Sequence, residues 1–68
     1  MKIIKEAFNI ALANSGMLLN ELCETADVTP AAVNRILNGK RQARPQTVGK
    51  LAKALGVPVE EIVLREEE

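Results

Sequence analysis

The chain has 68 residues, of which 47% are hydrophobic and 26% are charged, and its formal net charge is zero. A chain of this length buries only about 60% of its unfolded surface, which leaves no room for an enclosed active-site cleft. It has no His, and Cys23 is its only Cys, which excludes an internal disulfide and a cysteine-based zinc site. No apolar run approaches the roughly 18 residues of a membrane span. We therefore expect one domain over residues 1–68, in a reducing, cytoplasmic setting.

Apolar residues recur every three or four positions along the chain, a spacing that predicts amphipathic helices, and no strand pattern occurs. Gly16 is expected to end a first helix, and Asp27-Val28 to break the chain after a second. The stripe of the first helix is made of Ile4, Phe8, Ala11, Leu12 and Ser15. The stripe of the second is made of Leu19, Leu22, Cys23 and Ala26.

The stretch TPAAVNRILNGK, residues 29–40, carries the signals of a complete third helix. Thr29 suits the N-cap, because its hydroxyl accepts a hydrogen bond from an unpaired amide, and Pro30 fits the first turn. Gly39 is expected to end the helix after Asn38. The apolar stripe between these signals is Val33, Ile36 and Leu37.

Two more helices are expected after a polar loop at 40–44. The fourth begins at Pro45 and ends at Gly56, and a short fifth is indicated by Val59, Ile62 and Val63, before a frayed acidic tail at 65–68. The apolar face of the fourth helix is made of Val48, Leu51, Ala52 and Leu55. The expected fold is therefore an all-α, compact domain of five short helices.

The zero net charge hides an uneven distribution. Residues 28–59 hold six Lys and Arg and no acid, whereas residues 1–27 and 60–68 carry net charges of −2 and −4. A solvated polar surface explains this pattern as well as a surface directed at a polyanion does. No nucleophile–base set occurs, so an enzyme is the weakest hypothesis, and no catalytic residue, cofactor or metal is expected.

Residues 16–41, GMLLNELCETADVTPAAVNRILNGKR, form two predicted helices joined by a three-residue turn. This stretch resembles the Cro/repressor-type (XRE) helix-turn-helix family without a gap, and LAKALGV, residues 51–57, is similar to the family's fourth helix and its stop. The resemblance covers nearly the whole chain. It implies a five-helix, lambda-repressor-like DNA-binding domain of bacterial or phage origin, commonly dimeric and often a transcriptional repressor.

The chain departs from the family pattern at four positions. Leu18 replaces the usual Ser or Thr that caps the second helix, and Leu19 replaces a Gln that touches a DNA phosphate. We expect Leu19 to be partly buried under the third helix, and the alternative is an exposed apolar contact on the DNA side. Leu12 and Leu37 replace an Arg and a Glu that often pair, and an apolar pair in the core avoids the desolvation cost of that ion pair.

The resemblance also assigns the residues that would read DNA. The start of the third helix should enter the major groove, where Pro30 and Ala31 match two base-contacting positions. Ala31 and Ala32 offer only apolar contact, for which a thymine methyl is the natural target. Hydrogen-bonded reading is therefore expected from Asn34, which can pair with adenine, and from Arg35, which can bind guanine. The alternative is that both are ordinary solvent-facing residues.

The remaining expected contacts are to phosphate and to a second copy of the chain. Helix starts and cations are the groups that bind phosphate. The expected phosphate contacts are Thr29, Asn38, Lys40, Arg41, Arg44 and Thr47. The expected dimer interface consists of Val57, Pro58 and Leu64, and Glu66, Glu67 and Glu68 should lie away from DNA.

Two functions from different classes follow. The first is a sequence-specific regulator that binds double-stranded DNA as a homodimer and reads the major groove with residues 29–38. The second is a protein-interaction module on the same fold, an antitoxin-like or anti-repressor-like partner of a toxin or another protein. Leu18, Leu19 and the Pro-Ala-Ala start of the third helix favour the second function, whereas the basic middle and Arg35 favour the first. No membrane partner is expected.

Overall fold

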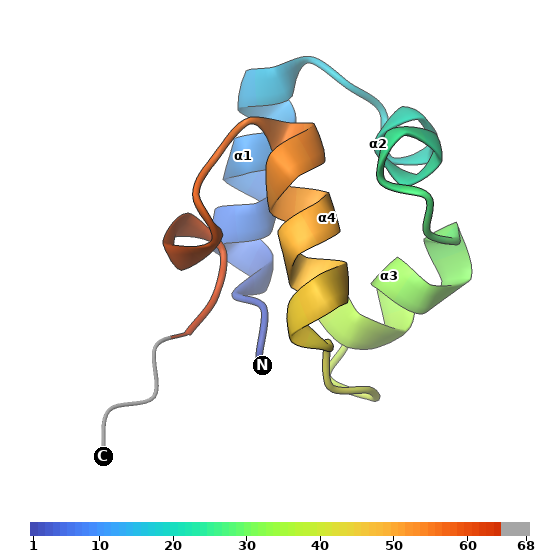
Figure 1. Cartoon of the computed structure of the whole chain (residues 1–68), viewed down its shortest axis with the longest axis vertical. Coiled ribbons are helices and arrows are strands. Elements are labelled where there is room, and N and C mark those ends of the chain that lie inside the picture. The colour runs from blue at the N-terminus through green and yellow to red at the C-terminus, as the bar shows by residue number, and fades with distance from the viewer. Residues whose placement is uncertain (65–68) are drawn as a thin grey trace.

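The computed structural model describes residues 1–64, and it contains four α-helices and one short 3-10 turn (Figure 1). The elements are α1 (Lys5–Ser15), α2 (Leu19–Ala26), α3 (Pro30–Leu37), α4 (Pro45–Leu55) and η1 (Val59–Glu61). The expectation of an all-α fold is confirmed. The expectation of a fifth helix was wrong, because η1 is a single 3-10 turn of three residues. The tail at 65–68, expected to fray, lies outside the described residues. None of the described helices has the length and apolar character that a membrane crossing requires.

Helix α4 lies at the centre of the fold and packs against α1, α2 and η1 (Figure 1). Its buried side chains Val48 and Leu51 meet Phe8 of α1, Leu22 of α2 and Ile62 in one continuous core. Leu12 and Leu37 are half-buried against this core. No polar or charged side chain is buried among residues 1–64. Cys23 is 2% exposed, and this burial raises the pKa of its thiol, because the thiolate would lose its hydration.

Helices α2 and α3 are each followed by a residue in the left-handed backbone conformation, which ends the helix. Asp27 has φ 59°, and it is the only residue other than glycine in the described chain with a positive φ. The amide of Val28 donates to the carbonyl of Cys23 at 3.0 Å, which closes α2. Gly39, with φ 75°, plays the same part after α3, where the amide of Lys40 donates to the carbonyl of Arg35 at 2.9 Å. These two closures fix the direction in which the chain enters and leaves α3.

Residues 1–4 form an extended segment, here called the N-terminal strap. On one side the amide of Ile4 donates to the carbonyl of Ile62 at 2.8 Å, and the amide of Leu64 donates to the carbonyl of Lys2 at 2.9 Å. At its start the terminal ammonium of Met1 donates to the carbonyl of Ala43 at 2.9 Å, and the amide of Ala43 donates back to Met1 at 3.1 Å. The strap therefore holds the 40–44 loop and the end of the fold together.

The strap also corrects one core assignment. Ile4 was expected on the buried stripe of the first helix, but it is 39% exposed, whereas Ile3 is 6% exposed. Ile3 and Val63 form an isolated antiparallel bridge, so the backbone there is extended and successive side chains point to opposite sides. Helical periodicity begins only at Lys5, where α1 starts.

Candidate nucleic-acid interface

The outer face of α3 follows from the positions of its buried residues. Val33 and Ile36 face the core, and a rotation of about 100° per residue places Ala31 and Asn38 on the opposite side, with Asn34 and Arg35 about 50° to either side of that line. All four of these residues are exposed, Asn34 on the flank toward α2 and Arg35 on the flank toward the 40–44 loop. Ala32 is half-buried, farther round on the flank of Arg35. Of the four predicted base readers, Ala31 therefore lies on the outermost line, Asn34 and Arg35 lie on either side of it, and Ala32 lies well off it.

The start of α3 is capped as expected. The hydroxyl oxygen of Thr29 accepts from the amide of Ala32 at 3.2 Å, and its backbone carbonyl accepts from Val33 at 3.2 Å. Pro30 has no amide hydrogen, so the amide of Ala31 is the donor left at this helix start. The Thr29 hydroxyl keeps its own proton and can donate it to a phosphate oxygen. The helix start thus offers two donors, fewer than an uncapped start without proline.

A concavity of about 240 Å³ lies between the start of α3 and the start of α4. It brings together four of the six predicted phosphate contacts, Thr29, Arg41, Arg44 and Thr47. Both helix starts carry partial positive charge, and two guanidinium groups add full charges beside them. The arrangement therefore attracts an anion from several directions, against the single carboxylate of Asp27, which also lines the concavity.

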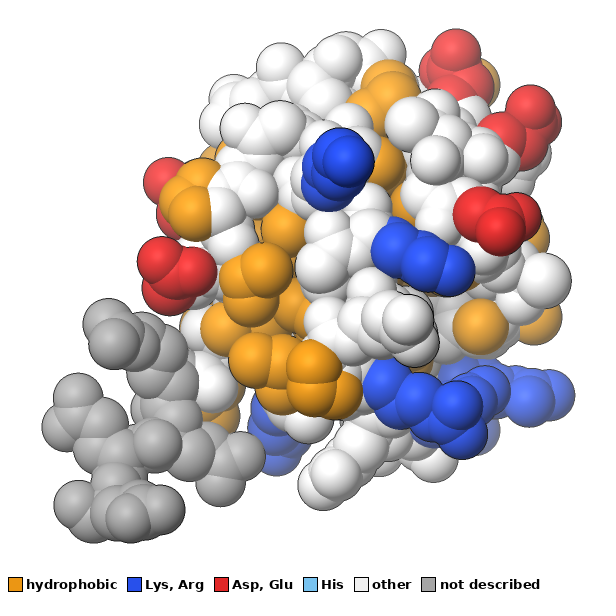
Figure 2. Space-filling model, in the orientation of Figure 1, with side chains coloured by type: hydrophobic (Ala, Val, Ile, Leu, Met, Phe, Trp, Pro, Cys, Tyr) orange, Lys and Arg blue, Asp and Glu red, His pale blue; other side chains and the backbone are white. Residues whose placement is uncertain are grey.

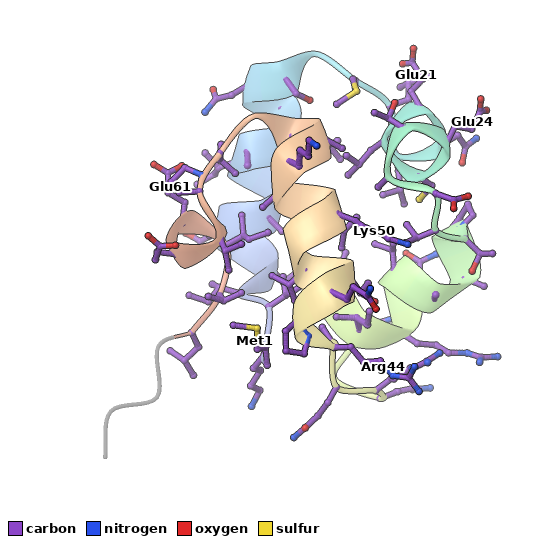
Figure 3. All side chains as sticks on the ribbon, in the orientation of Figure 1. Met1, Glu21, Glu24, Arg44, Lys50 and Glu61 are labelled. Atoms are coloured by element: carbon purple, nitrogen blue, oxygen red, sulfur yellow. The ribbon has the colours of Figure 1, made fainter. Side chains whose placement is uncertain are left out.

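Helix α4 adds backbone donors to this concavity. Arg44 is its N-cap and Pro45 its first residue, and the first amide bonded back is that of Val48, which donates to the carbonyl of Arg44 at 3.0 Å. The amides of Gln46 and Thr47 precede that bond and have no acceptor within the described residues. Figure 3 shows Arg44 at the start of α4, on the side of α3.

The other two predicted phosphate contacts, Asn38 and Lys40, lie at the end of α3 and outside the concavity. Both are exposed. The backbone of Lys40 is fixed by its bond to Arg35, and the amide of Gly39 donates to Ile36 at 3.1 Å. The six residues therefore form two groups, four around the concavity and two beyond the end of α3.

Sequence reasoning missed Gln42, which also lines the concavity. Its amide group is a hydrogen-bond donor between Arg41 and the buried Ala43. The one signal in the sequence is the apolar Ala43 inside an otherwise polar loop. The burial of Ala43 turns its neighbours outward, but that burial depends on the pairing with Met1.

The two flanks of α3 differ in charge. On the side of α2, a second concavity of about 670 Å³ is lined by Asn20, Glu24, Asp27 and Pro30, among others. Figure 2 shows acidic side chains along α2 and basic side chains gathered below α3 and the start of α4. Figure 3 places Glu21 and Glu24 on the outer side of α2. A polyanion on α3 is therefore attracted to the flank of the 40–44 loop and repelled from the flank of α2.

The unusual start of α2 is visible in the structure. Leu18 is the N-cap and is 71% exposed, while Leu19 is half-buried against the core, as expected. The carboxylate of Glu21 accepts from the amide of Leu18 at 2.9 Å. This is one half of a reciprocal cap, because a leucine side chain has no acceptor for the second bond.

The residues expected in a dimer interface differ in exposure. Leu64 is 51% exposed and Pro58 is exposed, whereas Val57 is half-buried against the core. Ile62 and Val63 are buried and close the core of the same chain. Of the three residues, Leu64 thus offers the largest exposed apolar side chain.

The helix pair and its turn match a known family. Residues 8–62 match the profile of the Helix-turn-helix family HTH_3, the Cro/C1-type (XRE) domains, so the match covers most of the chain. The chain belongs to this family. Membership implies DNA binding, and the family's domains are typically not enzymes. No curated protein and no solved structure matches the chain.

Proposed function

We propose that this helix-turn-helix domain is a sequence-specific transcriptional repressor that binds double-stranded DNA as a homodimer. The observation that carries the proposal is the concavity that unites Thr29, Arg41, Arg44 and Thr47 beside the exposed face of α3. A phosphate bound there would set α3 at a fixed depth in the major groove.

Reading of base edges falls to α3. Ala31 and Ala32 are small enough to let the helix approach the base pairs closely, and each offers a methyl group to thymine. One turn later, on either side of the outermost line, Arg35 reaches guanine with its guanidinium group and Asn34 reaches adenine. The side chains that read bases, on α3, thus lie beside the groups that hold the DNA backbone, which come from Thr29, the 40–44 loop and the start of α4.

The charge difference between the flanks of α3 predicts an asymmetric clamp. Phosphates on the side of the 40–44 loop meet Lys40, Arg41 and Arg44, while those on the side of α2 meet Glu24, and Asp27 lines the concavities on both sides. One domain therefore binds the phosphates of one DNA strand more strongly than those of the other. A second copy, bound in the opposite orientation, gives both strands the same contacts. Two copies related by two-fold symmetry read half-sites about 34 Å apart. Repression follows from occupation of the promoter.

Selection of bound sequences from a random DNA pool at low salt tests the proposal. We expect enrichment of a palindrome, and loss of preference at one base pair of each half-site with Arg35→Ala. A matched selection with Lys53→Ala, which removes one charge on the exposed surface of α4, should return the wild-type palindrome. A pool without any enriched sequence would refute sequence-specific binding.

A second candidate function rests on Leu18. This side chain is 71% exposed at the start of α2, where a polar group would suit a DNA backbone better. Its exposure favours a module that binds another protein, such as a toxin or an anti-repressor. An empty DNA selection, combined with a partner whose affinity falls with Leu18→Ser, would establish this alternative.

A further inference from the structure

A shallow groove runs between α1 and η1 and plays no part in the proposed DNA contacts. Its volume is about 200 Å³, and it is lined by Ala7, Ile10, Ala11, Asn14 and Glu61. Ile10 is 56% exposed, although it is one of the large apolar residues of the chain. The two alanines keep the floor of the groove low beside this raised isoleucine, so the surface has both a knob and a recess.

The position of Ile10 shows that it does not serve the core of its own chain. Phe8 and Ala11 are the buried residues of α1, and a rotation of about 200° separates Ile10 from Phe8. The groove therefore lies on the side of α1 that α4 does not cover. A single exposed apolar residue is common on protein surfaces, but here it borders a recess whose floor is formed by two alanines.

The charge on this face is negative. Glu61 lines the groove, and Glu6 lies one turn before Ile10 on the same face of α1. Lys5 is rotated by about 140° from Ile10 and so lies on another face. Figure 3 shows Glu61 on η1, on the opposite side of α4 from α3. An occupant of the groove should therefore be apolar in its centre and basic at its edges.

We propose that this groove docks a basic amphipathic helix of a partner protein. A large apolar side chain of that helix would enter the recess beside Ile10, and Lys or Arg one turn away would meet Glu61 and Glu6. A second copy of this chain fits less well, because a two-fold contact would place one negative face against an identical negative face. Because α4 separates the groove from α3 (Figure 1), the partner and DNA can bind at the same time.

A designed peptide tests the groove directly. The probe is a helix of about 20 residues, because isolated helices shorter than about 12–15 residues are marginal in water, and it has Leu on one face and Lys on the other. A scrambled peptide of the same composition lacks the apolar face and is the control ligand. Fluorescence anisotropy of the labelled peptides, with titrated protein, gives the affinities. We expect the amphipathic peptide to bind and the scrambled peptide to bind at least about tenfold more weakly.

Three variants locate the contact. Ile10→Asp and Glu61→Lys should each weaken the amphipathic peptide by about tenfold or more, because one removes the apolar anchor and the other reverses the charge. Glu24→Lys makes the same charge reversal on the exposed side of α2, away from the groove, and should leave the affinity within about twofold. Circular dichroism checks that all three variants are folded.

Several results would overturn the proposal. Equal weakening by Glu61→Lys and Glu24→Lys would show attraction to the overall charge instead of docking in the groove. An unchanged affinity with Ile10→Asp, or equal affinity for the scrambled peptide, would show that no apolar side chain anchors the peptide in the groove. A change in the sedimentation of the free protein with Ile10→Asp would make the groove an interface between copies. None of these results depends on DNA binding.

Discussion

Arg35 differs from the other cations near the interface because it projects from the exposed face of α3 itself. We expect Arg35→Ala to weaken binding to the selected DNA by about 1–3 kcal/mol and to relax the preference at one base pair. Lys40→Ala should weaken all DNA sequences alike, because Lys40 lies beyond the helix end. It should also reduce the slope of log affinity against log salt by about one unit.

Titrations of the two variants against the selected site and a random duplex, at several salt concentrations, make the comparison. Lys53→Ala is the control for loss of one charge without loss of a predicted contact. If Arg35→Ala and Lys40→Ala change both quantities in the same way, the division between base reader and phosphate contact fails.

Cys23 gives the domain a dependence of stability on alkaline pH. Burial raises the pKa of this thiol, so the folded state holds the proton more tightly than the unfolded state does. The contribution of the protonated thiol to the free energy of unfolding is complete below the pKa of an exposed thiol, about 8.5. This contribution is lost as the pH rises above that value. Urea unfolding from neutral to alkaline pH should show a fall in the free energy of unfolding that Cys23→Ala lacks. Parallel curves for the two proteins would contradict this assignment.

At the scale of the elements, α2 has an incomplete cap that can be repaired. Glu21 already accepts from the amide of Leu18, and a hydroxyl at position 18 would accept the reciprocal bond from the amide of Glu21. Leu18→Ser should therefore raise the free energy of unfolding by about 0.5–1 kcal/mol, with little loss of burial because Leu18 is 71% exposed. Thermal or urea unfolding measures the change.

Leu18→Ala is the matched control, since it removes the same side chain without adding an acceptor. Its stability should stay within a few tenths of a kcal/mol of the wild type, because surface substitutions are usually small in effect. A gain with Ala equal to the gain with Ser would assign the effect to loss of the exposed leucine and not to capping.

The elements that the sequence predicted are those whose signals are local. Thr29 and Gly39 bound α3 because a cap and a left-handed stop act within one turn, and both were recognised. Pro45 and Gly56 bound α4 in the same way. The end of α2 at Asp27 was also anticipated, although a left-handed aspartate is a weaker signal than glycine.

The predictions that were wrong or lacking failed because of contacts between segments distant in the sequence. Ile4 has the right spacing for the helical stripe, but the strap pairs with residues 62–64 and turns Ile3 inward instead. The same pairing holds Ile62 and Val63, so the segment expected to form a fifth helix has only the single turn η1. At the interface, Gln42 could not be predicted because two helix starts distant in sequence converge beside it.

At the scale of the whole molecule, the proposed dimer requires an apolar surface outside the core. Leu64 is a 51% exposed leucine at the end of the described chain, and Pro58 and Val57 complete the proposed interface. Leu64→Glu should convert the dimer to a monomer, because the substitution places a charge in an apolar contact. Sedimentation of both proteins up to high micromolar concentration measures the change.

Lys53→Glu makes a comparable change on the exposed surface of α4 and should leave the dimer intact. A wild-type protein that remains monomeric at these concentrations, and protects a single half-site on DNA, would exclude the dimer. The residues Glu66, Glu67 and Glu68, expected to lie away from DNA, are outside the described structure.

The N-terminal strap has a consequence for the order in which the chain folds. Its hydrogen bonds join residues 42 to about 60 positions apart, so it closes the longest loops among the described residues, whereas α2, the turn and α3 form from neighbours in sequence. We expect the strap to dock last and to open first, by local unfolding that leaves the helix pair intact. Native-state hydrogen exchange should show the amides of Ile4, Ala43 and Leu64 exchanging faster than those of Leu22 and Leu51. Opening of the strap would then free the 40–44 loop and its arginines to move, while the rest of the domain stays folded.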